Sequence, residues 1–215
     1  MGSPCLSPTV FLDSDNPSVQ RFASDAIGDA ASPKERAIRL FYAVREQIPY
    51  DPYAAVLEAD AMRASAVIAK GKGFCVAKAI LLAAVLRAIG IPARLGFADV
   101  TNHLATRRLL ELLRTDVFVF HGYAEVLLDD RWVKATPAFH SRLCARFGVP
   151  ALDFDGEHDA VLQPFDGRGR PFMQYLRSHG SFNDFPHEAM LQAWRKTYPH
   201  LFEMAQPTGD FEAEA

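Results

Sequence analysis

Apolar residues recur at helical spacing in the first part of the chain, and this pattern predicts two amphipathic helices. The first begins at Asn16-Pro17, where an N-cap residue precedes a proline at the first helical position, and its apolar face runs to Ile27. The second follows Ser32-Pro33-Lys34-Glu35, which has the spacing of a capping box, and ends before Pro49. We expect each helix to cover the core with one face.

The segment from Cys75 to Ile89 is apolar on nearly every side, which predicts a buried central helix. The stretch Lys70-Gly71-Lys72-Gly73 leads into this helix, and Gly90 and Pro92 end it. Its longest apolar run, Ala79 to Leu86, is much shorter than the roughly 20 residues that span a bilayer. We therefore expect no transmembrane segment and no membrane partner.

After this helix the pattern changes to the alternation and β-branched content of strands. The C-terminal third is more irregular in pattern, apart from one further helix. The predicted elements are a strand over Ala93 to Phe97, a short helix over Leu104 to Leu113, strands over Val117 to Leu128 and Trp132 to Thr136 joined by a turn at Asp129-Asp130, and a helix from Pro186 to Lys196. These elements predict an α+β fold in which an antiparallel sheet packs against the Cys75 helix.

Composition and charge narrow the class of protein. The chain is 49% hydrophobic and 23% charged with a net charge of -3, which is typical of a soluble globular protein. Lys and Arg residues are scattered, so no basic stripe indicates nucleic acid binding. The first residues have neither a basic start nor an apolar run, which favours a cytoplasmic protein. We expect one domain over residues 1–208 and a flexible tail over residues 209–215.

The three cysteines are Cys5, Cys75 and Cys144, and their odd number and wide spacing argue against a disulfide framework. Cys75 differs from the others because it opens the central helix, where unsatisfied N–H groups and the helix dipole favour a thiolate. Free cysteine is also among the most buried residue types, so a packing role for Cys75 is the structural alternative.

A reactive cysteine needs a base, and His121 is the histidine best placed for that role. It lies within the Val117 to Leu128 strand, and neutral imidazole accepts a proton and later returns it. Its alternative is a structural histidine at a sheet edge. Glu125 shares its face of the strand but lies about 13 Å along it, at roughly 3.3 Å per residue, so it cannot touch the ring.

Four ordered pieces of sequence resemble the transglutaminase-like superfamily, a papain-like group that includes bacterial cysteine proteases. The pieces lie within residues 65–138 and are Gly73-Phe74-Cys75, Leu86-Arg87-Ala88-Ile89-Gly90-Ile91-Pro92-Ala93-Arg94, His121-Gly122-Tyr123-Ala124-Glu125-Val126 and Trp132-Val133-Lys134-Ala135-Thr136-Pro137. The resemblance implies a papain-like, transglutaminase-like core in which flanking helices surround the Cys-bearing helix. It also implies that Cys75 is the nucleophile and His121 the base in cysteine-dependent hydrolysis or acyl transfer. The substrate would be a peptide or another amide, attacked through a thioester at Cys75.

Thr136 departs from the family pattern. Members usually carry an aspartate at this position to orient the histidine, whereas a threonine hydroxyl can accept a hydrogen bond but supplies no charge. Either Thr136 acts as a weaker orienting residue, or one of Asp99, Asp116 and Asp159 takes the role. A third interpretation is a binding module of this fold with weakened or lost catalysis.

Two further groups of residues have features of metal sites. His140 and Cys144 are four residues apart, which puts them on one helical face, but no second ligand pair accompanies them. The stretch Asp153-Phe154-Asp155-Gly156 lacks the glycine and glutamate positions of a calcium-binding EF-hand. We therefore expect no metal and no cofactor.

Overall fold

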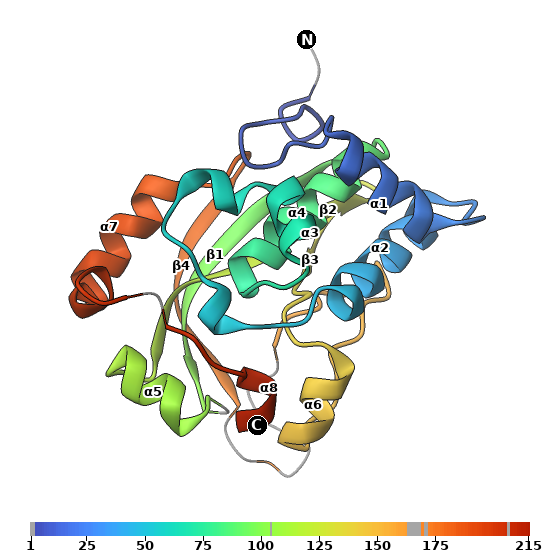
Figure 1. Cartoon of the computed structure of the whole chain (residues 1–215). Helices are drawn as coiled ribbons and strands as arrows, with labels where there is room; N and C mark the ends of the chain where they lie inside the picture. Colours follow the sequence, from blue (N-terminus) through green and yellow to red (C-terminus); the bar gives the residue numbers. More distant parts are fainter. Residues whose placement is uncertain (1–2, 104, 163–168, 170–171, 206) are drawn as a thin grey trace.

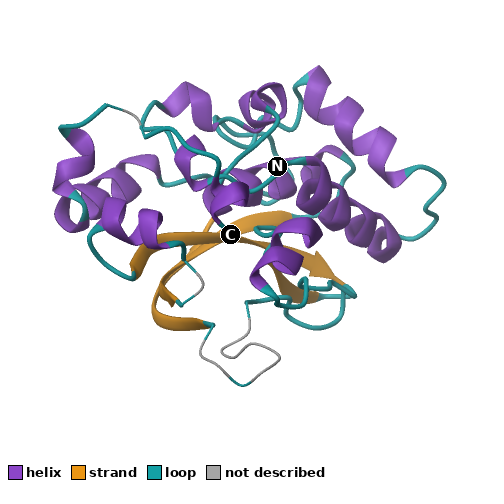
Figure 2. Cartoon of the chain, turned by 60° about the horizontal axis from the view of Figure 1, so that its bottom comes forward, coloured by secondary structure: helices purple, strands orange, loops and turns teal. Residues whose placement is uncertain are grey.

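The computed structural model describes residues 3–103, 105–162, 169, 172–205 and 207–215. Its centre is a sheet of strand order β3-β2-β1-β4, in which every neighbouring pair is antiparallel. Helices gather mainly on one face of this sheet (Figures 1 and 2). The strands are β1 (Ala93–Asn102), β2 (Val117–Leu128), β3 (Arg131–Ala135) and β4 (Met173–Phe182), and the α-helices are α1 (Pro17–Ile27), α2 (Pro33–Gln47), α3 (Ala64–Lys70), α4 (Cys75–Ala88), α5 (Arg107–Leu113), α6 (Ser141–Phe147), α7 (His187–Thr197) and α8 (Phe211–Glu214). The α+β fold class is confirmed.

The first two helices begin where the capping signals predict. The Asn16 side chain accepts a hydrogen bond from the Ser18 backbone N–H at the start of α1, at 3.0 Å. At the start of α2, Ser32 Oγ accepts from the Glu35 N–H, and the Glu35 carboxylate accepts from the Ala31 N–H, each at 3.1 Å. These bonds satisfy N–H groups that have no partner within a helix.

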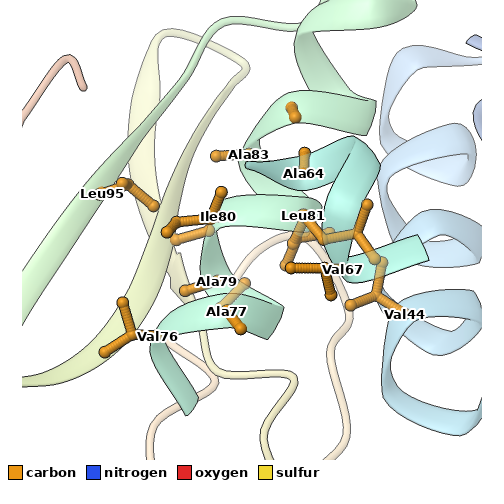
Figure 3. Close-up of a cluster of buried hydrophobic side chains, with 14 of the residues drawn as sticks. Val44, Ala64, Val67, Val76, Ala77, Ala79, Ile80, Leu81, Ala83 and Leu95 are labelled. Carbon is orange, nitrogen blue, oxygen red and sulfur yellow. The ribbon is translucent and has the colours of Figure 1, made fainter. Parts of the chain in front are cut away.

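Helix α4 is the centre of the core. Every residue from Val76 to Arg87 is buried, as the apolar character of the segment predicts. Figure 3 shows Leu95 of β1 on one side of α4 and Val44 of α2 on the other. Each buried Leu or Ile side chain stabilises the fold by about 1.5–3 kcal/mol, and α4 packs such side chains on all of its sides. Its first residue, Cys75, therefore has a fixed place relative to the sheet.

Two charged residues in α4 are also buried, and each donates to backbone carbonyls. Lys78 Nζ donates to the carbonyls of Arg45 at 2.9 Å and Ile48 at 2.5 Å, at the end of α2. Burial lowers the pKa of Lys78 to about 7. Arg87 donates to three carbonyls, those of Ser7, Ala93 and Asn183. The side chain of Lys78 joins α4 to α2 one turn after Cys75.

The sheet is larger than the sequence predicts. The hairpin of β2 and β3 forms as expected, with Asp129 and Asp130 at φ 48° and 60°, as a tight two-residue turn requires. Strand β1 runs five residues beyond the predicted end at Phe97. Strand β4 was not predicted, because its side chains are mostly exposed and do not alternate in polarity. The predicted first residue of helix α5, Leu104, lies outside the described residues.

The C-terminal part of the chain packs against the body of the protein. Helix α7 lies close to its predicted position. In residues 209–215, Phe211 of α8 is buried against Tyr50 and Tyr53, and Glu214 accepts from the Tyr53 hydroxyl at 2.7 Å. The aromatic anchor gives this segment contacts that its polar sequence does not indicate. No helix in the described part of the chain is long and apolar enough to cross a membrane.

Candidate active site

Cys75 is positioned by the glycine-rich segment before it. The Gly73 N–H donates to the Pro49 carbonyl at 3.1 Å, and the Gly73 carbonyl accepts from the Asp51 N–H at 3.0 Å. Phe74, the N-cap residue of α4, makes no side-chain capping bond. The N–H groups of the first helical turn are therefore not taken up by a capping side chain.

The sulfur of Cys75 lies among backbone N–H groups, and the residue is half-buried. Burial raises the pKa of the thiol to about 11, and the backbone N–H groups of Gly122, Val76 and Cys75 itself oppose part of that rise. The sequence predicts a field at the helix start that favours the thiolate, and desolvation outweighs this field. At pH 7 the resting residue is a neutral thiol.

The start of α4 lies directly against β2 because Gly122 has no side chain. A Cβ at Gly122 would be 2.9 Å from Val76 Cα and 3.3 Å from the Phe97 ring. Carbon atoms pack at about 3.5–4.0 Å, so a larger residue does not fit between the helix and the strand. Gly122 follows His121, and this close approach brings the helix start to the part of β2 that carries the histidine.

His121 is 5% exposed, and burial lowers the pKa of its ring to about 4. The ring is therefore neutral at pH 7 and able to accept a proton. Its Nε2 atom is buried and has no hydrogen-bond partner in the described part of the chain. The Tyr175 ring of β4 lies edge-on to it, with 6.3 Å between ring centroids.

The backbone before His121 has an unusual conformation that Asp99 stabilises. Phe120 has φ 62°, and the register of β1 against β2 shifts between Ala98 and Val100. Asp99 Oδ1 accepts from the Phe120 N–H at 3.1 Å and lies 2.6 Å from His179 Nε2. Asp99 was one of three aspartates considered as a partner for the imidazole; the structure shows it bound to the strand backbone and to a second histidine.

Thr136 follows β3 and is 1% exposed. Its Oγ1 atom has no hydrogen-bond partner among the described residues, while its N–H donates to the Ala160 carbonyl at 3.0 Å. The nearby Tyr175 is 38% exposed, but desolvation raises the pKa of its hydroxyl to about 12, and Thr136 and Cys75 are among the groups that act on this hydroxyl. Tyr175 is thus the residue common to the surroundings of Cys75, His121 and Thr136. Sequence reasoning missed it together with β4.

The remaining carboxylates considered for the third position lie elsewhere. Asp159 accepts from a backbone N–H of β3 at 2.9 Å, and Asp116 is exposed. Glu125 is buried in an ion pair with Arg94 at 2.5 Å, which makes it a structural residue of the sheet. None of these carboxylates bonds to His121 Nε2.

His140, weighed above as a metal ligand, uses both ring nitrogens within the protein. Its Nδ1 atom accepts from the Tyr50 N–H at 3.2 Å, and its Nε2 atom lies 3.3 Å from a Glu212 carboxylate oxygen. Cys144 Sγ lies 3.9 Å from the Phe139 carbonyl. In the described ranges no group of three or more His, Cys, Asp or Glu side chains could hold a metal ion.

Cys75 and His121 both line one cavity of about 250 Å³. Its other walls come from the loop after residue 54, from α5, from the first half of β2, and from α7 and the segment after it. The arrangement can hold a small substrate against a thiol, a neutral imidazole and several backbone N–H groups. These are the parts that acyl transfer through a cysteine requires.

The chain was compared with protein families, curated proteins and solved structures. No curated protein sequence matches the chain. Among solved structures, a candidate cysteine protease from Cytophaga hutchinsonii aligns at a TM-score of 0.49 and 17% identity over 83% of this chain, which spans about half (53%) of that protein. A candidate protease from Parabacteroides distasonis aligns at a TM-score of 0.41 and 15% identity. The alignment covers 59% of this chain and 26% of that protein. An arylamine N-acetyltransferase from Mycobacterium abscessus aligns at a TM-score of 0.42 and 16% identity. The alignment covers 63% of this chain and 47% of that protein.

The sequence profile of the transglutaminase-like superfamily matches residues 20–137, more than half of the 215 residues. The match includes Cys75, His121 and Thr136 and ends at Pro137. The ordered motifs of the sequence and the Cys-bearing helix against an antiparallel sheet thus have one explanation: the chain belongs to the transglutaminase-like superfamily.

Proposed function

We propose that this chain is a cysteine-dependent enzyme that hydrolyses an amide or transfers its acyl group through a thioester at Cys75. The observation that carries the proposal is the shared cavity. Cys75, at the start of α4, and His121, on the adjoining strand, both line it. The backbone N–H groups that face the sulfur support a site in which negative charge develops.

The chemistry uses His121 first as a base and then as an acid. The neutral ring takes the thiol proton while Cys75 Sγ attacks the carbonyl carbon, and the carbonyl electron pair moves to oxygen. When the C–N bond breaks, His121 returns the proton to the departing amine and the thioester remains. Water or a second amine then attacks the thioester, loses a proton to His121 and releases the acyl product, and the thiol is regenerated with that proton.

The resting charges favour proton transfer at the moment of attack over a preformed ion pair. The pKa of Cys75 is raised to about 11 and that of His121 is lowered to about 4, so both groups are neutral at pH 7. Thr136 would orient the ring as a hydrogen-bond acceptor without adding charge. A neutral hydrogen bond is about half as strong as a charge-assisted one, which implies modest activation of the thiol.

Acylation by p-nitrophenyl acetate, followed by intact mass and peptide mapping, tests the proposal. One acetyl group is expected on Cys75, and Cys75→Ser should abolish it. His121→Gln is expected to slow acylation by about 10²- to 10⁴-fold, the usual contribution of a general base. The matched control is Cys144→Ser, because Cys144 is a buried cysteine whose pKa is also raised to about 11. Labelling that persists in Cys75→Ser would contradict the proposal.

A binding module of this fold is the second candidate function, and two unpartnered atoms favour it. His121 Nε2 and Thr136 Oγ1 are both buried without a hydrogen bond among the described residues, so the third position does not hold the ring. Thr136→Asp separates the two functions. In an enzyme the carboxylate should stabilise the imidazolium and lower the apparent pKa of Cys75, whereas in a binding module the titration of Cys75 should not change.

A further inference from the structure

The cavity beside Cys75 is lined mainly by apolar residues. Leucine, valine, phenylalanine and tryptophan, several of them from β2, α5 and α7, make up more than half of the described lining residues. Among the described lining residues, Glu58 alone carries a formal charge, since His121 is neutral, and Glu58 is exposed. Away from the exposed Glu58, a charged substrate group would find no oppositely charged partner among the described lining residues, and a buried unpaired charge is strongly unfavourable.

The polar atoms of two aromatic lining residues are bonded to the protein. The Tyr198 hydroxyl accepts from the Val119 N–H at 2.8 Å and donates to the Val117 carbonyl at 2.6 Å. The Trp194 indole N–H donates to the Val119 carbonyl at 3.1 Å. The polar groups of β2 at this point are therefore satisfied by side chains. Tyr198 and Trp194 have their polar atoms engaged, which leaves their apolar surfaces for the cavity.

The size of the cavity limits what it can hold. Its volume of about 250 Å³ lies below the roughly 300–1,000 Å³ of pockets that enclose drug-sized ligands. A single compact group fits such a space, whereas several residues of a peptide do not. The reacting groups Cys75 and His121 are part of the same wall, so the occupant must be attached close to the reacting carbonyl.

We propose that the substrate carries one uncharged apolar group, aliphatic or aromatic, which fills this cavity and places the adjacent carbonyl against Cys75. The inference rests on the proposed function and specifies its substrate class. The apolar group can belong to the acyl side, which stays on the enzyme as the thioester, or to the departing amine. Both have the same contact chemistry, and a two-armed kinetic series distinguishes them.

The first arm varies the acyl chain from acetyl to octanoyl in p-nitrophenyl esters. The second arm keeps the acetyl group and lengthens the alkyl chain of N-acetyl-4-alkylanilines. Burial of each methylene is worth about 0.8 kcal/mol, which is about a fourfold rise in kcat/KM per added carbon until the cavity is full. The rise is expected in one arm. A terminal carboxylate on the same chain should abolish it.

Two variants of α5 connect the series to the cavity. Leu113 lines the cavity, so Leu113→Trp should fill part of it and reduce the rise in kcat/KM with chain length. Leu113→Ala enlarges the cavity and should move the optimum to longer chains. Leu110→Trp is the matched control, since Leu110 lies on the same helix, is half-buried and borders neither the cavity nor the core.

The outcomes separate this inference from the proposed function. Acylation of Cys75 at a rate that does not depend on chain length in either arm would overturn the apolar-group inference and leave the function standing. An equal effect of Leu110→Trp and Leu113→Trp would also overturn it. Failure of every ester and anilide to acylate Cys75 would overturn the proposed function, and the substrate class with it.

Discussion

Gly122→Ala is the substitution that most directly tests how the fold positions Cys75. Gly122 separates β2 from the first turn of α4, and the added Cβ would lie 2.9 Å from Val76 Cα. The conflict is with helix backbone, which cannot move aside as the end of a flexible side chain can. The start of α4, including Cys75, must therefore move away from His121.

The size of the displacement follows from packing distances. Carbon atoms in contact lie about 3.5–4.0 Å apart, so the helix start must move by about 0.6–1 Å. Overpacking of this kind costs about 1–3 kcal/mol of stability. A misplacement of about 1 Å in a reacting group can cost roughly 10²-fold in rate. We expect Gly122→Ala to slow acylation of Cys75 by about that factor.

The assay is the rate of acylation by p-nitrophenyl acetate, measured together with urea unfolding. Gly148→Ala is the matched control, because Gly148 has φ 67° and a Cβ there meets no atom within 4 Å. It should lose about 1–2 kcal/mol through backbone strain and keep its rate. If Gly122→Ala unfolds more easily but acylates at the wild-type rate, the close approach of α4 and β2 does not position the thiol.

Three further predictions follow from the surroundings of the site. Asp99→Ala leaves the buried Phe120 N–H without its acceptor, so the free energy of unfolding in urea should fall by about 1–3 kcal/mol. The control Asp116→Ala, at an exposed aspartate, should change the free energy of unfolding by less than about 0.5 kcal/mol. The pKa of His121 is lowered to about 4 in the folded protein, whereas it is about 6.5 in the unfolded chain, so protonation of His121 favours unfolding. Stability should therefore fall as the pH decreases from about 6.5 to about 4, by at most about 3 kcal/mol. His121→Leu should remove that part of the loss, and an unchanged pH profile would refute it. Alkylation of Cys75 by iodoacetamide should rise with pH toward about 11, and a plateau already reached at pH 7 would show an ion pair at rest.

The central helix and the hairpin could be predicted because local sequence determines both. A segment that is apolar on every side has no solvent-facing surface, so the helix starting at Cys75 must be buried. The turn at Asp129-Asp130 fixes the register of the two strands it joins. The cysteine and histidine of the candidate site lie on these two elements, so both could be proposed from sequence.

Strand β4 and Tyr175 could not be predicted, because they depend on distant pairing. Most β4 side chains are exposed, and the strand is held by backbone bonds to β1, far away in the sequence. No alternation of apolar and polar residues marks such a strand. The role of Asp99 escaped prediction for a related reason, since its partners Phe120 and His179 come from two different strands.

The protonation states of the site also depended on tertiary structure. Helix position alone indicates a lowered cysteine pKa, but the sign of the shift is set by how much water reaches the sulfur. The enclosing side chains come from four separate parts of the chain, as the lining of the cavity shows. Desolvation therefore reversed the expectation at Cys75.

The threonine at position 136 is consistent with this neutral site. Thr136 is 1% exposed, and burying a carboxylate there would cost several kcal/mol unless a cation lay beside it. His121 supplies no such cation at rest, because burial lowers the pKa of its ring to about 4. A hydroxyl avoids that cost, so Thr136 adds no charge to a site whose thiol and imidazole are both neutral at rest. The threonine and the neutral resting states of Cys75 and His121 are thus features of one environment, in which the proposed reaction develops charge only as substrate reacts.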